Sequence, residues 1–257
     1  MPDVPARSSD SDLVRAPRIV ALGPDAPSVN DLFLFMRDAE LRFDTLRMRI
    51  EDRTYGTRGE ALEISELWLR HPGRAKVVTR FAEDTDGRSR SFNVWITDEE
   101  RVRTYDGRAN LATVRPVRER VLGVTDPSLP AFSRVYAART DLPMETLVDT
   151  FVHPHGFVRN VLATARVELV GTITLVGDRE GFLLRAYHPR TTEVLTDRPD
   201  HWLEVGIDRP TGLVLMLVEH VSEQVTRDAR VTHLRLDTPI GDDAFELYLS
   251  SDVRMMY

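Results

Sequence analysis

Two histidines separated by one proline are the residues whose types and spacing most directly suggest chemistry. The segment FVHPHGF, residues 151–157, places both imidazoles at a break between two short helical segments. A pair of imidazoles in the mouth of a barrel could act as general acid and base, or supply two metal ligands. The structural alternative is favoured, because Pro154 interrupts a helix, His153 can cap the preceding carbonyl groups and Gly156 relieves the turn. His153 and His155 are therefore candidate catalytic residues, with a structural role weighed above catalysis.

Neither a metal nor a cofactor is expected at these histidines. A metal site needs a third and a fourth ligand, and the other histidines, among them His188, His201, His220 and His233, are distant and not closely spaced. The sequence contains no cysteine, which excludes thiol chemistry. It also contains no nucleophile elbow, phosphate-binding loop, dinucleotide fingerprint or zinc-protease motif. The common hydrolase, nucleotide-binding and zinc-protease functions are thus disfavoured.

Aromatic and methionine side chains form a second candidate set, because they could line a cavity for an apolar molecule. Five of them are taken as candidate ligand-binding residues: Phe35, Met36, Trp68, Trp95 and Phe157. The alternative is that most of them belong to an ordinary core. Arg190 and Arg198, which bracket a loop between two strands, are further candidates because guanidinium groups bind carboxylates and phosphates of the kind a lipid headgroup carries. Their alternative role is a solvated loop rim.

The charge balance bears on the partners. The chain of 257 residues has 34 basic and 41 acidic residues and a net charge of -7. Because the basic residues are scattered instead of clustered, nucleic acid is not an expected partner. No apolar run approaches the roughly 20 residues that span a bilayer, so no integral membrane segment is expected. The first 20 residues lack the apolar core of a signal peptide, and no cysteine could carry a lipid anchor, so we expect a cytoplasmic protein.

The elements that must position these residues follow from hydrophobic periodicity. We expect residues 1–27 to form a flexible leader and residues 28–257 to form a single domain. From Ser28 onwards apolar residues recur every three or four positions, which predicts an amphipathic helix of about four turns. Alternation of apolar and charged residues then predicts strands near residues 45–55, 60–70, 74–82, 90–98, 101–106 and 109–116, and again near 165–176, 180–188, 201–209, 212–220 and 224–236.

Between the two groups of strands, residues 126–164 contain four prolines that divide short helical segments, which predicts a helical insert. About eleven antiparallel strands are too many for a flat sheet, so the sheet should curl. The predicted fold class is α+β and predominantly antiparallel. It is a curled half-open barrel closed by an N-terminal helix and a helical lid insert.

The carboxy-terminal half resembles LolA-like and RseB-like bacterial lipoprotein-carrier proteins of the actinobacterial type. Residues 170–180, VGTITLVGDRE, resemble the family hairpin G-T-x-x-V-x-G-R-E, and residues 205–213, VGIDRPTGL, resemble its V-D-x-x-T-G-L hairpin. The resemblance is most specific over residues 165–249. These motifs are markers of the fold, in which glycines permit tight turns and Asp208 can accept hydrogen bonds from turn amides.

The resemblance implies a function as well as a fold. Members of this family bind a lipid, an acyl chain or a lipidated polypeptide on the apolar inner face beneath the helical lid, without a cofactor. The first hypothesis is therefore non-covalent binding or carriage of a hydrophobic ligand. A cofactor-free cyclase or isomerase using His153 and His155 is an alternative. A regulatory protein that binds a peptide or an anti-sigma factor is another, because RseB-like relatives bind an anti-sigma partner.

Overall fold

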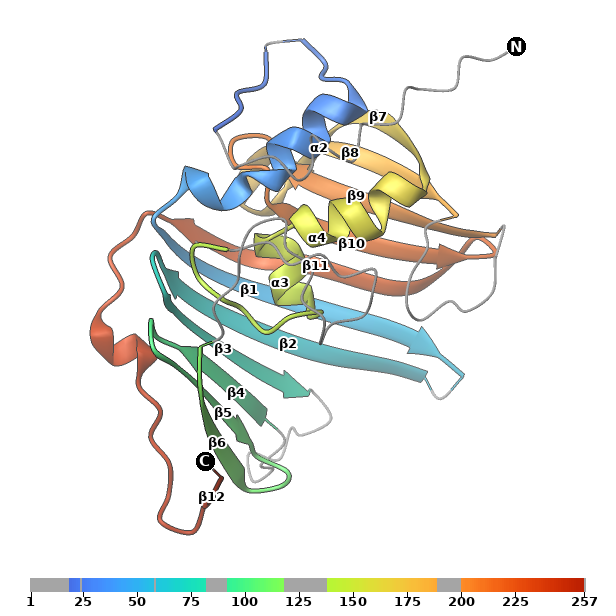
Figure 1. Ribbon diagram of the computed structural model, residues 1–257. Helices are drawn as coiled ribbons and strands as arrows, with labels where there is room; N and C mark the ends of the chain where they lie inside the picture. The colour runs from blue at the N-terminus through green and yellow to red at the C-terminus, as the bar shows by residue number, and fades with distance from the viewer. Residues whose placement is uncertain are drawn as a thin grey trace.

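A single twelve-stranded sheet organises the chain (Figure 1). The structure is a computed structural model that describes residues 19–23, 25–57, 59–81, 92–117, 138–188 and 200–256, and the structural statements below concern these residues. The strands are β1 (Thr45–Gly56), β2 (Gly59–Arg70), β3 (Arg74–Phe81), β4 (Phe92–Thr97), β5 (Arg101–Asp106), β6 (Leu111–Pro116), β7 (Arg166–Leu175), β8 (Arg179–Tyr187), β9 (His201–Asp208), β10 (Val214–Val221), β11 (Gln224–Leu236) and β12 (Arg254–Met256).

The strand order is β12-β6-β5-β4-β3-β2-β1-β11-β10-β9-β8-β7. Strands β1–β6 form one meander and β7–β11 a second, and the antiparallel pairing of β1 with β11 joins them. Of the described strands, only β12 is parallel to its neighbour, β6. The predicted α+β half-open barrel is confirmed, and its predicted strands correspond to β1–β11. The additional strand β12 has three exposed residues and no alternation from which it could be predicted.

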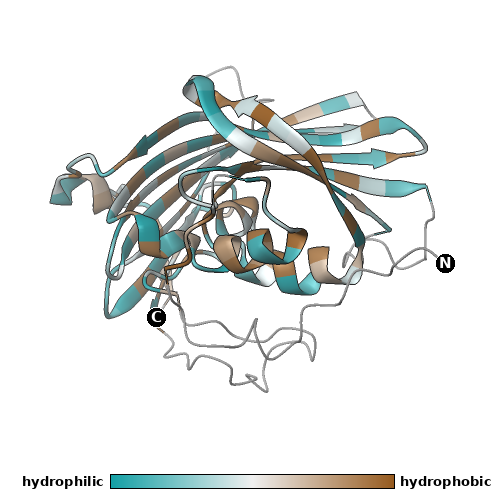
Figure 2. Ribbon diagram, turned by 90° about the horizontal axis from the view of Figure 1, so that it is seen from above, coloured by the Kyte–Doolittle hydropathy of each residue, from teal (hydrophilic) through white to brown (hydrophobic). Residues whose placement is uncertain are grey.

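The helices lie on the concave face of the curled sheet, as Figures 1 and 2 show. They are α2 (Val29–Arg37), α3 (Leu147–Val152) and α4 (His155–Asn160), with the short 3₁₀ segments η1 (Ala39–Arg42), η2 (Leu162–Thr164), η3 (Val176–Asp178) and η4 (Asp242–Phe245). In the part of the chain that the structure describes, no helix combines the length and the hydropathy needed to cross a membrane.

Helix α2 begins in a capping box. The Ser28 hydroxyl accepts a hydrogen bond from the Asp31 N–H group, and the Asp31 side chain accepts one from the Ser28 backbone. The helix is shorter than the four turns predicted, because it ends at Asp38, where the chain tightens into η1. There Asp38 forms a buried ion pair with the adjacent Arg37, and the backbone N–H group of Asp38 bonds to the Met36 carbonyl group.

Two apolar clusters pack on opposite faces of the sheet. The larger lies between the concave face and the helices and contains side chains from β1, β2, β3, β8, β9, β10 and β11. The smaller lies on the other face of β3–β6, where Leu247, Leu249 and Val253 from the C-terminal segment cover it. Alternation along each strand thus divides its side chains between two cores, one of which is closed by helices.

Candidate ligand-binding site beneath the helices

The concave face is apolar where the helices cover it. Strands at the centre of the sheet supply the following buried side chains: Leu46, Met48 and Ile50 of β1, Leu67 and Leu69 of β2, Leu215 and Leu217 of β10, and Ala229 and Val231 of β11. The helices add a matching set: Leu32, Phe33 and Met36 of α2, Val148, Phe151 and Val152 of α3, and Val158 of α4. The apolar surface of the sheet is therefore buried by three helices of nine, six and six residues.

Farther along the same face, four central strands carry charged side chains. Asp52 of β1 lies opposite Glu63 of β2, and Asp52 accepts two hydrogen bonds, of 2.9 and 2.7 Å, from the guanidinium group of Arg227 on β11. Burial and the neighbouring Asp52 raise the pKa of Glu63. Glu219 of β10 lies opposite Arg227 and 2.8 Å from Nε2 of the buried His201. The concave face is thus amphipathic along its length.

His153 stands at the centre of a buried charged group at the end of α3. Its Nδ1 lies 3.0 Å from Oδ1 of Asp149, one turn earlier, and its Nε2 lies 3.4 Å from Oε2 of Glu40 in η1. Burial alone would lower the pKa of His153, but the hydrogen bond to Asp149 and the negative charges of Glu40, Asp149 and Asp141 outweigh burial and raise it. The imidazolium therefore bonds within α3 through Nδ1 and contacts the carboxylate of η1 through Nε2.

The segment before α3 completes this charged group. The backbone N–H group of Arg139 donates to Glu40 at 2.9 Å, and the Thr140 hydroxyl accepts from the Gly73 N–H group at 2.8 Å. The same hydroxyl lies 2.8 Å from Nδ1 of His71. Burial and the positive charges of Arg139 and His153 lower the pKa of His71 to about 3. The β2–β3 turn, η1 and α3 are thereby tied together around residues 139–140.

His155 lies in a different environment from His153, although only Pro154 separates them. It is the first residue of α4 and is buried. Burial and the positive charges of Arg159 and Arg37 lower its pKa to about 4. The two imidazoles thus have opposite charge preferences, one favouring the cation and the other the neutral ring. The engagement of both His153 nitrogens by carboxylates fits a positioning role better than proton transfer to a substrate.

The predicted ligand-binding side chains are divided among three places. Met36 is fully buried in the large core, and Trp95 and Phe157 pack partly buried against it. Phe35, also on α2, lies outside that core and lines a separate pocket. Trp68 packs partly buried against the smaller cluster on the other face.

The strand register explains the separation of the two tryptophans. Trp95 is paired with Val77, whose side chain lies in the helix-covered core. Trp68 is paired with Lys76, one position away from Val77 and hence on the opposite face. The structure thus brings Met36, Trp95 and Phe157 to the same core and places Trp68 elsewhere. Arg190 and Arg198 lie outside the described residues.

Residues that sequence reasoning did not single out complete the site. Glu40 and Arg139 are far from His153 in the sequence, and no local pattern links them. Asp149 precedes His153 by four positions, a spacing that brings side chains together on a helix and that could have identified this pair. Where the chain is described, no group of three or more histidine, cysteine, aspartate or glutamate side chains has an arrangement able to hold a metal ion.

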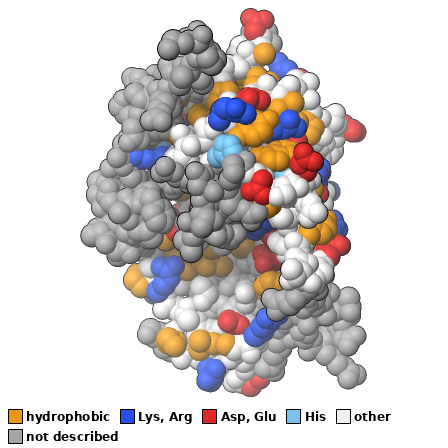
Figure 3. Space-filling model, turned by 90° about the vertical axis from the view of Figure 1, so that its right-hand side faces the viewer, with side chains coloured by type: hydrophobic (Ala, Val, Ile, Leu, Met, Phe, Trp, Pro, Cys, Tyr) orange, Lys and Arg blue, Asp and Glu red, His pale blue; other side chains and the backbone are white. Residues whose placement is uncertain are grey.

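Charges of both signs are interspersed on the side of the molecule shown in Figure 3. Among the side chains drawn there, basic and acidic residues alternate with apolar ones, and neither sign forms a broad patch. This distribution on the described part of that face resembles an ordinary solvated surface.

Comparison with known proteins finds similarity in structure and none in sequence. The sequence matches no protein-family model and no curated protein.

Several solved structures are similar to this one. An uncharacterized conserved protein from Thermus thermophilus is 11% identical, with a TM-score of 0.45 over 87% of this chain and 96% of that one. MucB is 16% identical, with a TM-score of 0.49 over 88% of this chain, which spans only 65% of MucB. A LolA superfamily protein from Nitrosomonas europaea is 9% identical, with a TM-score of 0.33 over 86% of this chain and 99% of that one. The structural neighbours thus include LolA-superfamily and MucB proteins.

Proposed function

We propose that the protein binds a hydrophobic ligand, such as a lipid or an acyl chain, between the concave face of the sheet and helices α2–α4. The observation that carries this proposal is the nature of the cover: among the described residues, short helices bury the apolar half of an open sheet's concave face. Exposing an apolar sheet face to water is unfavourable, so the face must be buried. Either the helices or an apolar ligand can bury it.

The helices are suited to being displaced. Helices of six residues are not stable in water by themselves, so α3 and α4 depend on their packing in the core, where α3 contacts β10 and α4 contacts α2 and η2. Pro154 separates them and interrupts the helix between them. The charged group around His153 ties the end of α3 to η1, whereas the contacts with the sheet are apolar and non-directional.

The burial of an acyl chain could compensate for part of the apolar packing between the helices and the sheet. Each methylene group transferred from water contributes about 0.8 kcal/mol, so roughly ten of them contribute about 8 kcal/mol before the costs of ordering the ligand and moving the helices. The charged side chains of Asp52, Glu63, Arg227 and Glu219 farther along the face suit the polar end of an amphiphile.

The proposal is tested by titrating delipidated protein with a fluorescent long-chain fatty acid. We expect saturable binding of one ligand per chain, accompanied by a change in tryptophan fluorescence that Trp95→Phe removes. Leu162→Ala creates space beneath the helices and should increase affinity severalfold, whereas Ala163→Ser, at an exposed neighbouring position, should not. Absence of saturable binding, or equal effects of both variants, would contradict the proposal.

A polypeptide is a second candidate ligand, favoured by the edge of the sheet. Strand β7 is ten residues long, is the last strand in the order and pairs only with β8 in the described structure. An unpaired edge can add an extended peptide as a further strand, although the bulge between Leu169 and Gly171 interrupts this one. The structural neighbour MucB has been crystallised in complex with MucA. Backbone amides of β7 that become protected from hydrogen exchange on peptide addition would support this function, and unchanged exchange would oppose it.

A further inference from the structure

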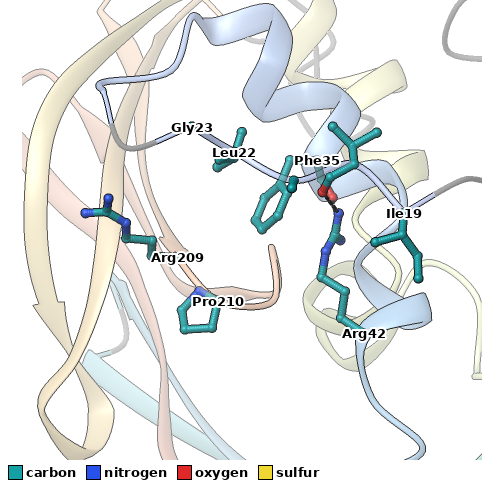
Figure 4. A pocket seen from close by; sticks show the side chains of 9 residues that line it. Ile19, Leu22, Gly23, Phe35, Arg42, Arg209 and Pro210 are labelled. Carbon is teal, nitrogen blue, oxygen red and sulfur yellow. Dashed lines mark hydrogen bonds between the residues drawn. The ribbon is translucent and has the colours of Figure 1, made fainter.

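A second site lies beside helix α2, outside the core that the helices cover. An open pocket of about 370 Å³ is lined by residues 19–23, the Phe35 side of α2, Arg42 of η1 and the turn between β9 and β10 (Figure 4). Its volume falls in the range of ~300–1,000 Å³ typical of small-molecule sites. Ile19, Leu22 and Pro210 line it together with the Phe35 ring, and polar and apolar atoms contribute about equally to its wall.

Arg42 contributes a cationic group to this wall. Its guanidinium lies 3.9 Å from the centroid of the Phe35 ring and donates hydrogen bonds to three carbonyl groups, those of Phe35 at 2.9 Å, Thr211 at 3.2 Å and Val20 at 2.7 Å. These bonds draw three separate segments of the chain around the pocket. An arginine has five N–H groups, so donors, including the Nε–H group, remain beyond these three bonds.

The charge of Arg42 has no paired carboxylate among the described residues. Burial lowers the pKa of Arg42 only to about 10, so the guanidinium stays cationic at neutral pH. The acceptors of its three hydrogen bonds are all neutral carbonyl groups, and no carboxylate of the described residues lies within ion-pair distance. Asp38, whose charge acts on Arg42 from farther away, is bound to Arg37 at 2.6 Å. A partly buried cation beside apolar walls is stabilised by an added anion.

Arg209, the other arginine of the pocket, differs in this respect. It forms an ion pair of 2.5 Å with Glu180, and Figure 4 shows its guanidinium directed away from Phe35. Its charge is therefore already balanced. Arg42 is the cation that a ligand in this pocket would meet.

We propose that this pocket binds a small organic anion, a carboxylate carried on a short apolar chain. The carboxylate accepts hydrogen bonds from the remaining N–H groups of Arg42, and the chain packs against Phe35, Leu22 and Pro210. A guanidinium–carboxylate contact is the strongest kind of polar contact available here, because both partners are charged. Phe35 and Arg42 set the site apart from the space occupied by the helix-covered core, because neither belongs to that core, whereas Leu22 packs against it.

The test compares three eight-carbon probes on the same protein by two-dimensional NMR and calorimetry: octanoate, 1-octanol and octylamine. We expect octanoate to bind at least tenfold more tightly than octanol, and octylamine not to bind. The shifted resonances should lie in residues 19–23, Phe35, Arg42 and Pro210. Equal binding of octanoate and octanol, or shifts confined to α3 and α4, would overturn the proposal. The second result would instead indicate the space beneath the helices, so the two sites are distinguished.

Single substitutions distinguish the contribution of the Arg42 charge from that of the pocket volume. Arg42→Gln should weaken octanoate binding at least tenfold and abolish the preference for octanoate over octanol. Arg209→Gln is the matched control, and its effect should be less than twofold because that charge is already paired. Ala21→Trp fills the pocket from an exposed position and should abolish binding without requiring the core to repack. Octanoate affinity that survives Ala21→Trp would refute the site even if Arg42→Gln did not fold.

Discussion

Replacing His153 by leucine removes the cation that holds two carboxylates beneath the helices. In the native protein the His153 side chain is 6% exposed and the Glu40 side chain 2% exposed, so their 3.4 Å contact is shielded from water. Among the described residues, leucine leaves Glu40 with the Arg139 N–H group and no opposite charge at that distance. Breaking a buried ion pair by removing one partner costs about 3–5 kcal/mol, and we expect a loss of unfolding free energy in that range for His153→Leu.

The cost should depend on pH, and its sign follows from the direction of the pKa shift. The pKa of His153 is raised above its usual value of 6.5, so the imidazolium is favoured in the folded state. Its stabilising contribution is fully present below pH 6.5 and is lost as the pH rises through the folded-state pKa. The difference between the native protein and His153→Leu should therefore be greatest near pH 6 and should shrink towards pH 9.

Urea unfolding of both proteins at pH 6 and pH 9, followed by circular dichroism, measures this difference. Glu40→Gln combined with His153→Leu should recover part of the loss, because an amide replaces the uncompensated carboxylate. His233→Leu, at an exposed position of β11, is the control and should change stability by less than about 0.5 kcal/mol. An equal cost at both pH values, or no rescue by the double variant, would refute the role assigned to the charged group.

Three further predictions concern the packing and the charged part of the concave face. Gly212→Ala should lower the unfolding free energy by about 1–2 kcal/mol in urea titrations, because Gly212 has a φ of 80°, whereas Gly23→Ala should be neutral because a Cβ there meets no atom within 4 Å. Phe151→Ala should cost about 3–5 kcal/mol in the same assay, since the ring is fully buried, and should increase the binding of a fluorescent acyl ligand by creating space. Asp52→Asn should lower the raised pKa of Glu63, as measured by carbon NMR titration of its carboxyl group, while burial keeps that pKa above its ordinary value.

Strand positions are the part of the fold that the sequence predicts best. Alternation of apolar and charged residues arises because one strand face is buried, so β1 to β11 lie within a few residues of their predicted positions. The turn at residues 208–212 is also as predicted, since Asp208 accepts a hydrogen bond from the Thr211 N–H group. The end of α2 was not predictable from periodicity, because the apolar pattern continues beyond Asp38 while the backbone changes.

Contacts between distant segments account for what sequence reasoning missed. His153 was identified, but its partner Glu40 depends on how η1 meets α3, which no local pattern encodes. Likewise, the separation of Trp68 from Trp95 follows from strand register, and register requires knowledge of the partner strands. Arg42 carries no motif, and its place in the pocket depends on residues 19–23 folding back to it.

Hydrogen exchange of the delipidated protein, measured by mass spectrometry with and without a long-chain fatty acid, tests the central claim most directly. If the helices are a displaceable cover for a hydrophobic ligand, saturating ligand should increase exchange in α3 and α4 and leave the central strands β1 and β2 protected. Exchange that is unchanged in both helices at saturating ligand concentration, or a failure of the ligand to bind, would contradict it.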